Sequence, residues 1–442
     1  MPKKKDRKLK TAHKIAARDA GSSQGMPAIA RNDEGESDGE DDSMSVVTHL
    51  SLDEAESVMC ESPVVDDTGE LSEEAVALLE DKLKESIDNA GHRNTAVRCA
   101  ALKILSQAFR KYYLPEFLID WKITIVDTLE KTLKKSDAQS QRESVCIAAL
   151  LAVQLGLDIS ETLAKLISNL RPIACDPSQP ILLRTQCCIA IGIYCALCEE
   201  ETENMNQCKQ AFRSIWAGFK TNCASECGPL FAASLQMWSL ILSHPKIPRT
   251  ALQDAIQNDV PRLCTCLDSP HLEFRIATGE ALAVVYELGY ELLPSFRGVA
   301  SHFMLLTRFQ ELATDSAKYH AKRDRRMQRA TFREIHAAIK DGEGPDLTVK
   351  FGHECVYLDS WCLKLYYDTL CHILTFGINL HLKENVLVRD CFSLGPPIVE
   401  SQLRRLNKSE RQSINATMNK ARTQLRTKQR GCKQRLASFT AA

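Results

Sequence analysis

The sequence contains few aromatic residues and no long uncharged apolar run, and both absences narrow its class. Phe, Trp and Tyr make up only 6% of the 442 residues, while Leu and Ala dominate the apolar segments, which favours helices over a β-sandwich. No segment reaches the roughly 18–20 uncharged apolar residues that a membrane span needs. The Lys-rich residues 1–10 are followed by no apolar core. We therefore expect neither a secretory signal nor a membrane partner.

Catalytic and cofactor motifs are missing as well. The chain contains no phosphate-binding glycine loop, no His-Glu-x-x-His pair and no Ser elbow. Each of these motifs places the residues of a nucleophile, metal or phosphate site at a fixed spacing. We find no other pattern of this kind in the sequence. We expect a protein that is not an enzyme, that uses no cofactor and that has no small-molecule substrate.

Eighteen cysteines raise the question of disulfides or a metal site. Most of them lie inside apolar helical patterns, so we interpret them as reduced core residues of an intracellular protein. Cys195 and Cys198, with Cys223 and Cys227 about 25 residues further on, have the spacing nearest to a zinc site. Structural zinc sites favour turns, whereas Cys195 follows a helical pattern. Helix packing is the favoured interpretation, and no metal is expected.

Charge is strongly segregated along the chain although the totals nearly cancel, with 56 Lys+Arg and 57 Asp+Glu. Residues 1–19 are basic, whereas residues 33–74 contain sixteen acidic side chains and no Lys or Arg. Low hydrophobicity with high charge density predicts that residues 1–70 form a disordered basic and acidic leader. The basic start is either a nuclear-import signal or a solvated arm. We expect a cytoplasmic protein, with the nucleus as a second compartment in the first case.

From about Leu71 the apolar residues recur at three- and four-residue spacing, which predicts consecutive amphipathic helices. Breaks are expected at Gly and Pro residues, Pro172 and Pro294 among them. The expected helices span residues 95–113, 115–135, 138–155, 158–170, 180–198, 203–219, 229–243, 250–267, 271–290, 294–313 and 315–340.

An internal repeat underlies these helices. An arginine lies early in each of four apolar helices, namely Arg98, Arg142, Arg184 and Arg275. The first three are 44 and 42 residues apart, and the last gap of 91 is about two periods. The space between holds a degenerate copy at residues 230–234. A period near 40–47 residues is typical of HEAT and armadillo repeats, whose helix pairs stack on one another. An irregular helical bundle is the alternative.

The predicted fold class is therefore all-α. An armadillo/HEAT-like helical repeat array covers residues 71–341. A small helical C-terminal domain follows at residues 342–400, with Tyr357, Trp361 and Tyr366 as its expected core. Residues 401–442 form a basic tail.

One predicted helix near the end of the array has a strongly cationic face. Spacings of four, three, four and four residues place the following cations on one stripe: Lys318, Lys322, Arg325, Arg329 and Arg333. Arg326 widens the stripe, and Asp324 is the acid within it. An ordinary solvated face mixes Glu with Lys at i,i+4 spacing. We favour contact with nucleic-acid phosphates, which would neutralise the crowded charge, over a solvated face.

The tail after residue 401 carries eleven cations against the single acid Glu410, a net charge of 11 − 1 = +10. It has no apolar stripe that could dock on the array. We expect it to be disordered alone and helical when bound to RNA. The candidate nucleic-acid-binding residues are Arg404, Arg405, Lys408, Arg411, Lys420, Arg422, Arg426, Lys428, Arg430, Lys433 and Arg435.

Several uncommon strings, in the same order along residues 75–435, resemble the interferon-related developmental regulator family. They are Leu-Ala-Thr-Asp-Ser-Ala-Lys-Tyr-His-Ala-Lys at 312–322, Arg-Ile-Ala-x-Gly-Glu at 275–280, Lys-Phe-Gly at 350–352, Tyr-Leu-Asp-x-Trp at 357–361 and Leu-Gly-Pro-Pro at 394–397. In the tail, the matching positions include Lys420–Thr423, Arg426 and Lys428. Ser409, Ile414 and Asn419 stand where the family has aromatics, so we expect phosphate contact rather than base stacking.

The resemblance implies an armadillo-type body and a ribosome-binding translational repressor. In this reading the basic C-terminal segment occupies the mRNA channel and nearby tRNA sites, and the partners are rRNA and ribosomal proteins. An alternative role in the family is a nuclear transcriptional co-regulator that bridges histone-deacetylase complexes. In that case the array would hold peptides of chromatin co-repressor proteins.

Overall fold

The computed structural model describes residues 73–135, 137–315 and 321–398, together with positions 409 and 416. The predicted leader, residues 1–70, and almost all of the basic tail, residues 401–442, lie outside the described residues. Within the described part, helices dominate and the strands form one two-stranded hairpin. The all-α fold class is confirmed.

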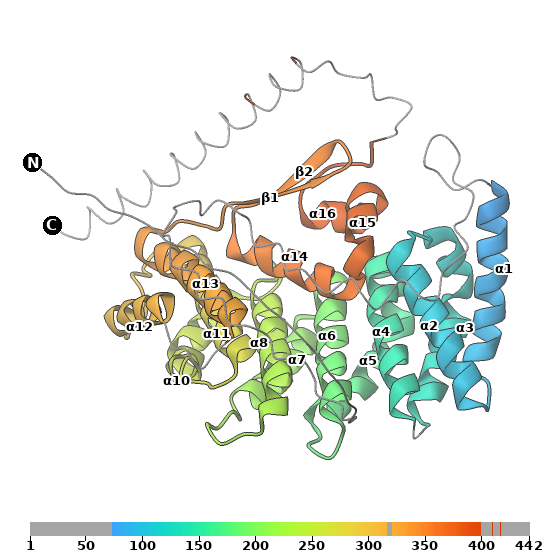
Figure 1. Cartoon of the computed structure of the whole chain (residues 1–442), viewed down its shortest axis with the longest axis horizontal. Helices are drawn as coiled ribbons and strands as arrows, with labels where there is room; N and C mark the ends of the chain where they lie inside the picture. The colour runs from blue at the N-terminus through green and yellow to red at the C-terminus, as the bar shows by residue number, and fades with distance from the viewer. Residues whose placement is uncertain (1–72, 136, 316–320, 399–408, 410–415, 417–442) are drawn as a thin grey trace, which may run out of the picture. The chain divides into compact units, whose positions relative to one another are not determined.

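The helices before residue 293 form two rows that pack against each other (Figure 1). The row termed the α2 row contains α2 (Thr95–Lys111), α4 (Ala138–Leu155), α6 (Ile181–Leu197), α8 (Gly228–Leu242) and α11 (Leu272–Leu292). The row termed the α1 row contains α1 (Glu73–Ala90), α3 (Pro115–Leu133), α5 (Ser160–Cys175), α7 (Thr202–Trp216), α9 (Arg249–Asp254) and α10 (Val260–Cys266). A π-helical turn, Ala255–Asp259, joins α9 to α10.

The predicted repeat is present in the spacing of the α2 row. Its helices begin at residues 95, 138, 181, 228 and 272, which are 43, 43, 47 and 44 residues apart. Helix α8 occupies the position of the degenerate copy. The residues three and seven positions after the four repeat arginines are all buried: Ala101, Leu105, Val145, Ala149, Cys187, Ile191, Thr278 and Leu282. The repeat is therefore a packing unit, because each of these positions faces the neighbouring helices.

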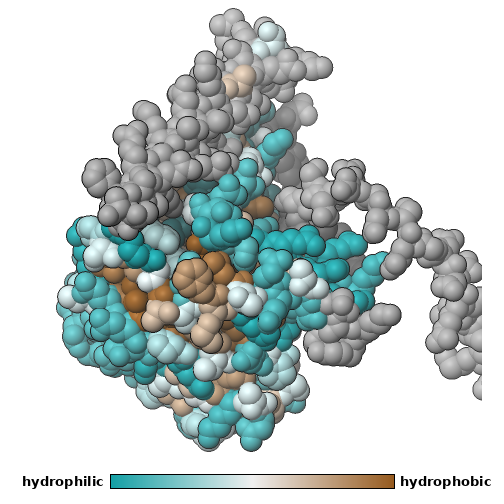
Figure 2. Space-filling model, turned by 90° about the vertical axis from the view of Figure 1, so that its left-hand side faces the viewer, coloured by the Kyte–Doolittle hydropathy of each residue, from teal (hydrophilic) through white to brown (hydrophobic). Residues whose placement is uncertain are grey.

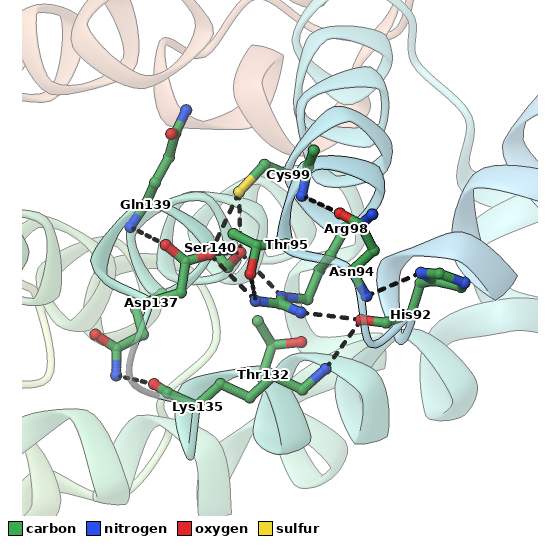
Figure 3. A network of polar contacts seen from close by, with 12 residues as sticks. His92, Asn94, Thr95, Arg98, Cys99, Thr132, Lys135, Asp137, Gln139 and Ser140 are labelled. Carbon is green, nitrogen blue, oxygen red and sulfur yellow. Dashed lines mark hydrogen bonds and ion pairs between the residues drawn. The ribbon is translucent and has the colours of Figure 1, made fainter.

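Polar residues early in the α2-row helices bind the backbone carbonyls around the end of the preceding helix. Arg98 is buried, and its Nη1 donates to the carbonyl of His92 at 2.9 Å (Figure 3). Its Nη2 lies 3.2 Å from a carboxylate oxygen of Asp137, which begins the next repeat. Hydrogen bonds from the Ser140 hydroxyl and other donors hold the pKa of Asp137 below its usual value. This network joins two successive repeats through buried, satisfied polar groups.

One repeat arginine does not bind the preceding segment. Arg142 is exposed, and the neighbouring Gln141 donates instead to two carbonyls around the C-terminus of α3, at 3.0 and 2.7 Å. Arg184 and Arg275 do bind carbonyls of the preceding segment. The repeat position thus requires a side chain that donates hydrogen bonds to the preceding turn, and an amide serves as well as a guanidinium.

Three predicted helix boundaries differ from the structure. Pro294 to Ser301 form no helix, so α12 begins at His302 (His302–Thr314), and Gly298 has a positive φ of 111° in this irregular segment. Helix α13 begins at Lys322 (Lys322–Asp341), later than predicted. Pro172 lies inside α5 rather than at its end. Pro172 lies on the exposed side of α5. Water can therefore bind the carbonyl four residues earlier, which loses its helical donor because proline has no N–H.

One helical segment is apolar enough to resemble a membrane span, although none is expected from the sequence. Residues Ala138–Cys175, from α4 through α5, are long and apolar enough by length and composition to cross a membrane. However, 72% of the apolar window is buried inside the structure. Packing in the middle of the array accounts for this hydrophobicity, as it does for the core helices of soluble proteins.

Residues 347–398 form a unit termed the C-terminal module. It contains β1 (Leu347–Phe351), β2 (Glu354–Leu358), α14 (Trp361–Leu374), a 3₁₀ turn at Thr375–Gly377, α15 (Ile378–Glu384) and α16 (Val386–Cys391). The antiparallel hairpin pairs Leu347 with Leu358 and Phe351 with Glu354. A wholly helical segment was the prediction here, so the hairpin corrects it. Trp361 is buried, whereas Tyr357 and Tyr366 are half-buried.

The C-terminal module packs on the α2 row. Helix α14 contacts α2, α4, α8 and α11, the first and the last helices of that row among them (Figure 1). Helix α13 packs beside it on α11 and α12. Helix α16, which precedes the tail, contacts α4, so the basic helix and the tail-bearing end of the module are attached to different parts of the α2 row.

Candidate nucleic-acid interface

Helix α13 is fixed to the array by one apolar face. Phe332, Ile335 and Ile339 are buried, and a Cβ added at Gly279 of α11 would lie 2.7 Å from the Phe332 ring, so the two helices approach closely. Gln328, also buried, accepts hydrogen bonds from Arg275 and donates to the carboxylate of Asp315 at 3.2 Å. These contacts fix which face of α13 points away from the array.

The predicted cationic stripe runs along the flank of the buried face, from its edge to the solvent-exposed side of the helix. Lys322, Arg326 and Arg333 are exposed, and Arg325 and Arg329 are half-buried. None of the five is buried, which agrees with the predicted placement on one side of the helix. Lys318, the first residue of the predicted stripe, lies outside the described residues.

Three of these cations have no acidic partner within the described part of the chain. Among the described residues, Lys322, Arg326 and Arg329 take part in no ion pair, whereas cations elsewhere on the array do, such as Arg308 with Asp268 at 2.8 Å. Like charges crowded on one helix face repel one another unless an anion neutralises them. This face of α13 therefore has the charge and exposure that a phosphate backbone requires.

The side of the molecule that carries α12 and α13 combines hydrophilic and apolar surface (Figure 2). The apolar contribution from α12 is concentrated at its start, where Phe303 and Met304 are 83% and 77% exposed. The sequence pattern does not single out these two residues, because their apolar neighbours Leu305 and Leu306 belong to the same run.

Arg389 fixes the point where the basic tail leaves the C-terminal module. It is fully buried, and its guanidinium binds both carboxylate oxygens of Glu354 on β2, at 2.9 and 2.8 Å. The same guanidinium donates to the carbonyls of Leu382, Gly395 and Pro396 at 2.9, 2.7 and 3.1 Å. One side chain thus joins the hairpin, α15 and the Leu-Gly-Pro-Pro segment that precedes the tail.

The eleven predicted tail cations, from Arg404 to Arg435, lie outside the described residues, so their role stays a prediction. What the described structure does show is how the segment before the tail is attached to the module. Sequence reasoning missed Arg389 because nothing in the local sequence distinguishes it from a surface arginine. Its burial depends on Glu354, 35 residues earlier in the chain.

Two charged residues of the array bind opposite ends of α14. The carboxylate of Glu287 on α11 accepts hydrogen bonds from the Ser360 hydroxyl at 2.6 Å and from the Trp361 backbone amide at 2.7 Å. At the other end, Nε of Arg110 on α2 donates to the carbonyl of Ile373 at 3.1 Å. An anion at the N-terminus and a cation at the C-terminus both complement the helix dipole.

A half-buried ionic cluster lies between these two ends. Nζ of Lys364 on α14 is 2.8 Å from Glu280 on α11 and 2.7 Å from Asp368. Burial alone would lower the pKa of Lys364, but Glu280 and Asp368 outweigh it and raise that pKa above its usual value. Lys364 therefore stays charged and joins the module to the array.

No metal site emerges from the described residues, since no group of three or more His, Cys, Asp and Glu side chains is placed to hold an ion. Cys195 lies buried in α6 and Cys198 is the buried C-cap of the same helix. Cys223 and Cys227 are half-buried. The cysteines in the described ranges are free thiols.

Comparison with known proteins identifies the family. The model of the interferon-related developmental regulator family matches residues 44–340, and that of the interferon-related protein conserved region matches residues 385–434. The chain belongs to the interferon-related developmental regulator family. The second match runs from the N-cap of α16 through the Arg389-bound segment into the basic tail, so the tail and its attachment belong to one region of the family.

Curated relatives match over most of their length. Interferon-related developmental regulator 1 of Sus scrofa is 32% identical over 380 residues, covering 82% of both chains. Interferon-related developmental regulator 2 of Mus musculus is 33% identical over 367 residues, covering 80% of this chain and 82% of the relative. A crystal structure of an engineered protein covers 58% of this chain and 98% of its own, with 12% identity and a TM-score of 0.40. Family membership supports a role as a regulator of development or differentiation.

Proposed function

We propose that this protein is a ribosome-binding translational repressor. The repeat array docks on the ribosome, the exposed face of α13 contacts rRNA phosphates, and the basic tail occupies the mRNA channel and nearby tRNA sites. The observation that carries this proposal is the face of α13, where Lys322, Arg326 and Arg329 have no acidic partner among the described residues. A helix with such a face is a binding surface for polyanions.

The attachment of the tail supports the same role. The Leu-Gly-Pro-Pro segment is bound by the buried Arg389, so the tail starts from a fixed place on the module. Helix α13 packs on α11, and α16, which precedes the tail, packs on α4 of the same row, so one array carries both the cationic helix and the start of the tail. Two basic elements tethered together raise each other's effective concentration on one RNA surface.

The rival function is a nuclear co-regulator that bridges histone-deacetylase complexes, with the array holding peptides. The side of the α2 row where such a peptide would bind is already in contact with α14, which touches α2, α4, α8 and α11. The described structure thus favours contact through α13 and the tail over peptide capture by the row.

Co-sedimentation with ribosomes through a sucrose cushion tests the proposal. We expect a truncation after Ile398 to abolish ribosome binding while keeping the residues that Arg389 binds. The triple substitution K322A/R326A/R329A should weaken binding and lower the slope of log affinity against log salt by about 0.7–0.9 for each phosphate that is no longer neutralised. The matched control, K82A/K103A/K131A, removes three exposed lysines from the other end of the array. Undiminished pelleting of the truncated protein, or an equal effect of the control triple, would refute this role.

Fractionation of cell extracts with and without ribonuclease separates the two functions. A ribosome-bound repressor should sediment with ribosomes and shift when rRNA is digested. A co-regulator should sediment with protein complexes of unchanged size after ribonuclease treatment.

A further inference from the structure

The solvent-facing side of α3 carries apolar residues that the fold does not use. Phe117, Leu118 and Ile125 of this helix are buried against the array. Ile119 and Ile123, one turn apart on the opposite side, are 45% and 63% exposed. Exposed β-branched residues lower helix propensity and add nothing to the core, so their presence is not explained by folding.

A third exposed aliphatic residue belongs to the same surface. Nζ of Lys122 on α3 donates to the carbonyl of Asp158 at 2.6 Å, which brings the turn Gly156–Ile159 next to α3. Leu157 in that turn is 57% exposed. Ile119, Ile123 and Leu157 therefore form an apolar surface that two segments of the chain build together, termed the α3 face.

Carboxylates border the α3 face. Glu116, Asp120 and Asp127 occupy the same exposed side of the helix as the two isoleucines, at helical spacing. Asp158 is exposed beside Leu157. Burial raises the pKa of Tyr113, and the charges of Glu116 and Asp158 raise it further, so both carboxylates lie near one phenol. The apolar surface is thus bordered by carboxylates along one flank of α3 and at Asp158, while Lys122 lies between α3 and the turn.

This combination selects the chemistry of the partner. Carboxylates repel phosphates, so nucleic acid and anionic membranes are poor partners for this face. The acidic leader of the chain is repelled for the same reason. The basic tail has the right charge, but it lacks an apolar stripe, so it would leave Ile119, Ile123 and Leu157 uncovered.

We propose that the α3 face is a docking site for a segment of another protein, namely an amphipathic helix with a Leu/Ile/Val stripe between rows of Lys and Arg. The stripe covers Ile119, Ile123 and Leu157, and the cations meet Glu116, Asp120 and Asp127. Apolar contacts at the centre with charges around them are the usual arrangement of protein interfaces, in which charge guides orientation and association. This inference is independent of RNA binding, because α3 and α13 belong to different ends of the array.

A synthetic probe peptide tests the docking site on the full chain. The probe is an 18-residue amidated helix of Leu and Lys with leucines at i, i+3 and i+4 spacing. A scrambled peptide of the same composition has no stripe, and it reports the purely electrostatic binding to which the acidic leader contributes. Fluorescence anisotropy measures both at 50 and 300 mM salt, and circular dichroism confirms that each variant keeps its melting temperature.

We expect the I119S/I123S variant to bind the striped probe about tenfold more weakly or worse, because it removes the apolar centre of the surface. D120N/D127N should weaken binding about threefold at 50 mM salt and reduce its salt dependence. The control F303S/M304S, which changes the exposed apolar pair on α12, should bind within about twofold of wild type. The chain truncated after Ile398 should do the same.

Four results would overturn the docking site. The first two are an unchanged affinity of I119S/I123S for the striped probe and an equally weakened affinity of the α12 control. The third is equal binding of the striped and scrambled probes. The fourth is an affinity for the striped probe that rises more than about tenfold when the tail is removed. The last result would mean that the tail itself occupies the α3 face.

Discussion

Glu287 and Arg110 belong to α11 and α2, the last and first helices of the α2 row, and they bind the two ends of α14. The Glu287 carboxylate accepts the Trp361 amide at the N-terminus, and Arg110 donates to the Ile373 carbonyl at the C-terminus. Each charge satisfies backbone groups that every helix leaves without a partner. It also complements the helix dipole at its end. The C-terminal module is therefore held to the array as a fixed part rather than a loosely tethered domain.

Removal of the Glu287 carboxylate should loosen this attachment. In Glu287→Ala, the Ser360 hydroxyl and the Trp361 amide are deprived of a charged acceptor in a half-buried place, and we expect a decrease of about 2–3 kcal/mol in the free energy of unfolding. Urea unfolding measures the decrease, and hydrogen exchange locates it at α14. Glu273→Ala, which removes an exposed acid from the first turn of α11, is the control and should cost at most about 1 kcal/mol, with no change at α14. Unchanged protection of the α14 amides in Glu287→Ala would contradict this role.

Gly377 tests the other end of the attachment. A Cβ at this position would lie only 1.7 Å from the carbonyl oxygen of Arg110, a backbone atom that cannot move without disturbing α2. We expect Gly377→Ala to lower the melting temperature by several degrees or more, in line with overpacking costs of about 1–3 kcal/mol. Gly91→Ala is the matched control, because its nearest neighbour would be an oxygen at an ordinary 3.7 Å. Equal melting temperatures for the two variants would show that the module can shift away from α2.

Acid should weaken the module through its histidines. Burial of His381 lowers its pKa from 6.5 to about 4, and burial also lowers the pKa of His372. Between pH 6.5 and 4 the unfolded chain binds a proton that folded His381 does not, so the free energy of unfolding falls as the pH falls. For a shift of this size the decrease approaches about 3 kcal/mol. Unfolding curves from pH 7 to pH 4 measure it.

His381→Asn supplies the comparison for the acid prediction. The variant removes the titrating ring, so its stability should depend less on pH in the same window, with His372 responsible for part of what remains. The slope rather than the absolute stability is the readout, because the substitution also changes packing. Identical slopes in wild type and variant would rule out His381 as the source.

Much of the array could be predicted from the sequence, because its determinants are local. The three- and four-residue spacing of apolar residues predicts nearly every helix of the two rows. The spacing of the four repeat arginines, from Arg98 to Arg275, predicts the length of the repeat. The cationic face of α13 follows from spacing alone, and its described members, Lys322 to Arg333, are exposed or half-buried along the flank of the face that carries the buried Phe332.

The attachments of the C-terminal module could not be predicted in this way. The bonds from Ser360 to Glu287 and from Arg110 to Ile373 join residues 73 and 263 positions apart, and no local pattern pairs them. The β-hairpin had a signal that helical periodicity obscured, namely the alternation of Leu347, Val349 and Phe351 before a turn.

Arg389 provides a test of whether the tail must start from a fixed place. The buried guanidinium binds Glu354 through two oxygens and reaches the carbonyls of Gly395 and Pro396 on its other side. Lysine keeps the charge but cannot reproduce this planar fork. Arg389→Lys should therefore leave the array folded while it releases the segment before the tail. Hydrogen exchange should show faster exchange at residues 392–395.

If the fixed start matters for RNA binding, Arg389→Lys lowers ribosome affinity by about three- to tenfold through a lower effective concentration of the tail. The isolated tail peptide, residues 399–442, is the reference, since it lacks the attachment in any case. Its affinity for ribosomes sets the lower limit, and the variant should lie between that limit and wild type. Should the variant bind ribosomes as tightly as wild type while its 392–395 amides exchange faster, the attachment serves only the stability of the module, because a released tail then reaches its site equally well.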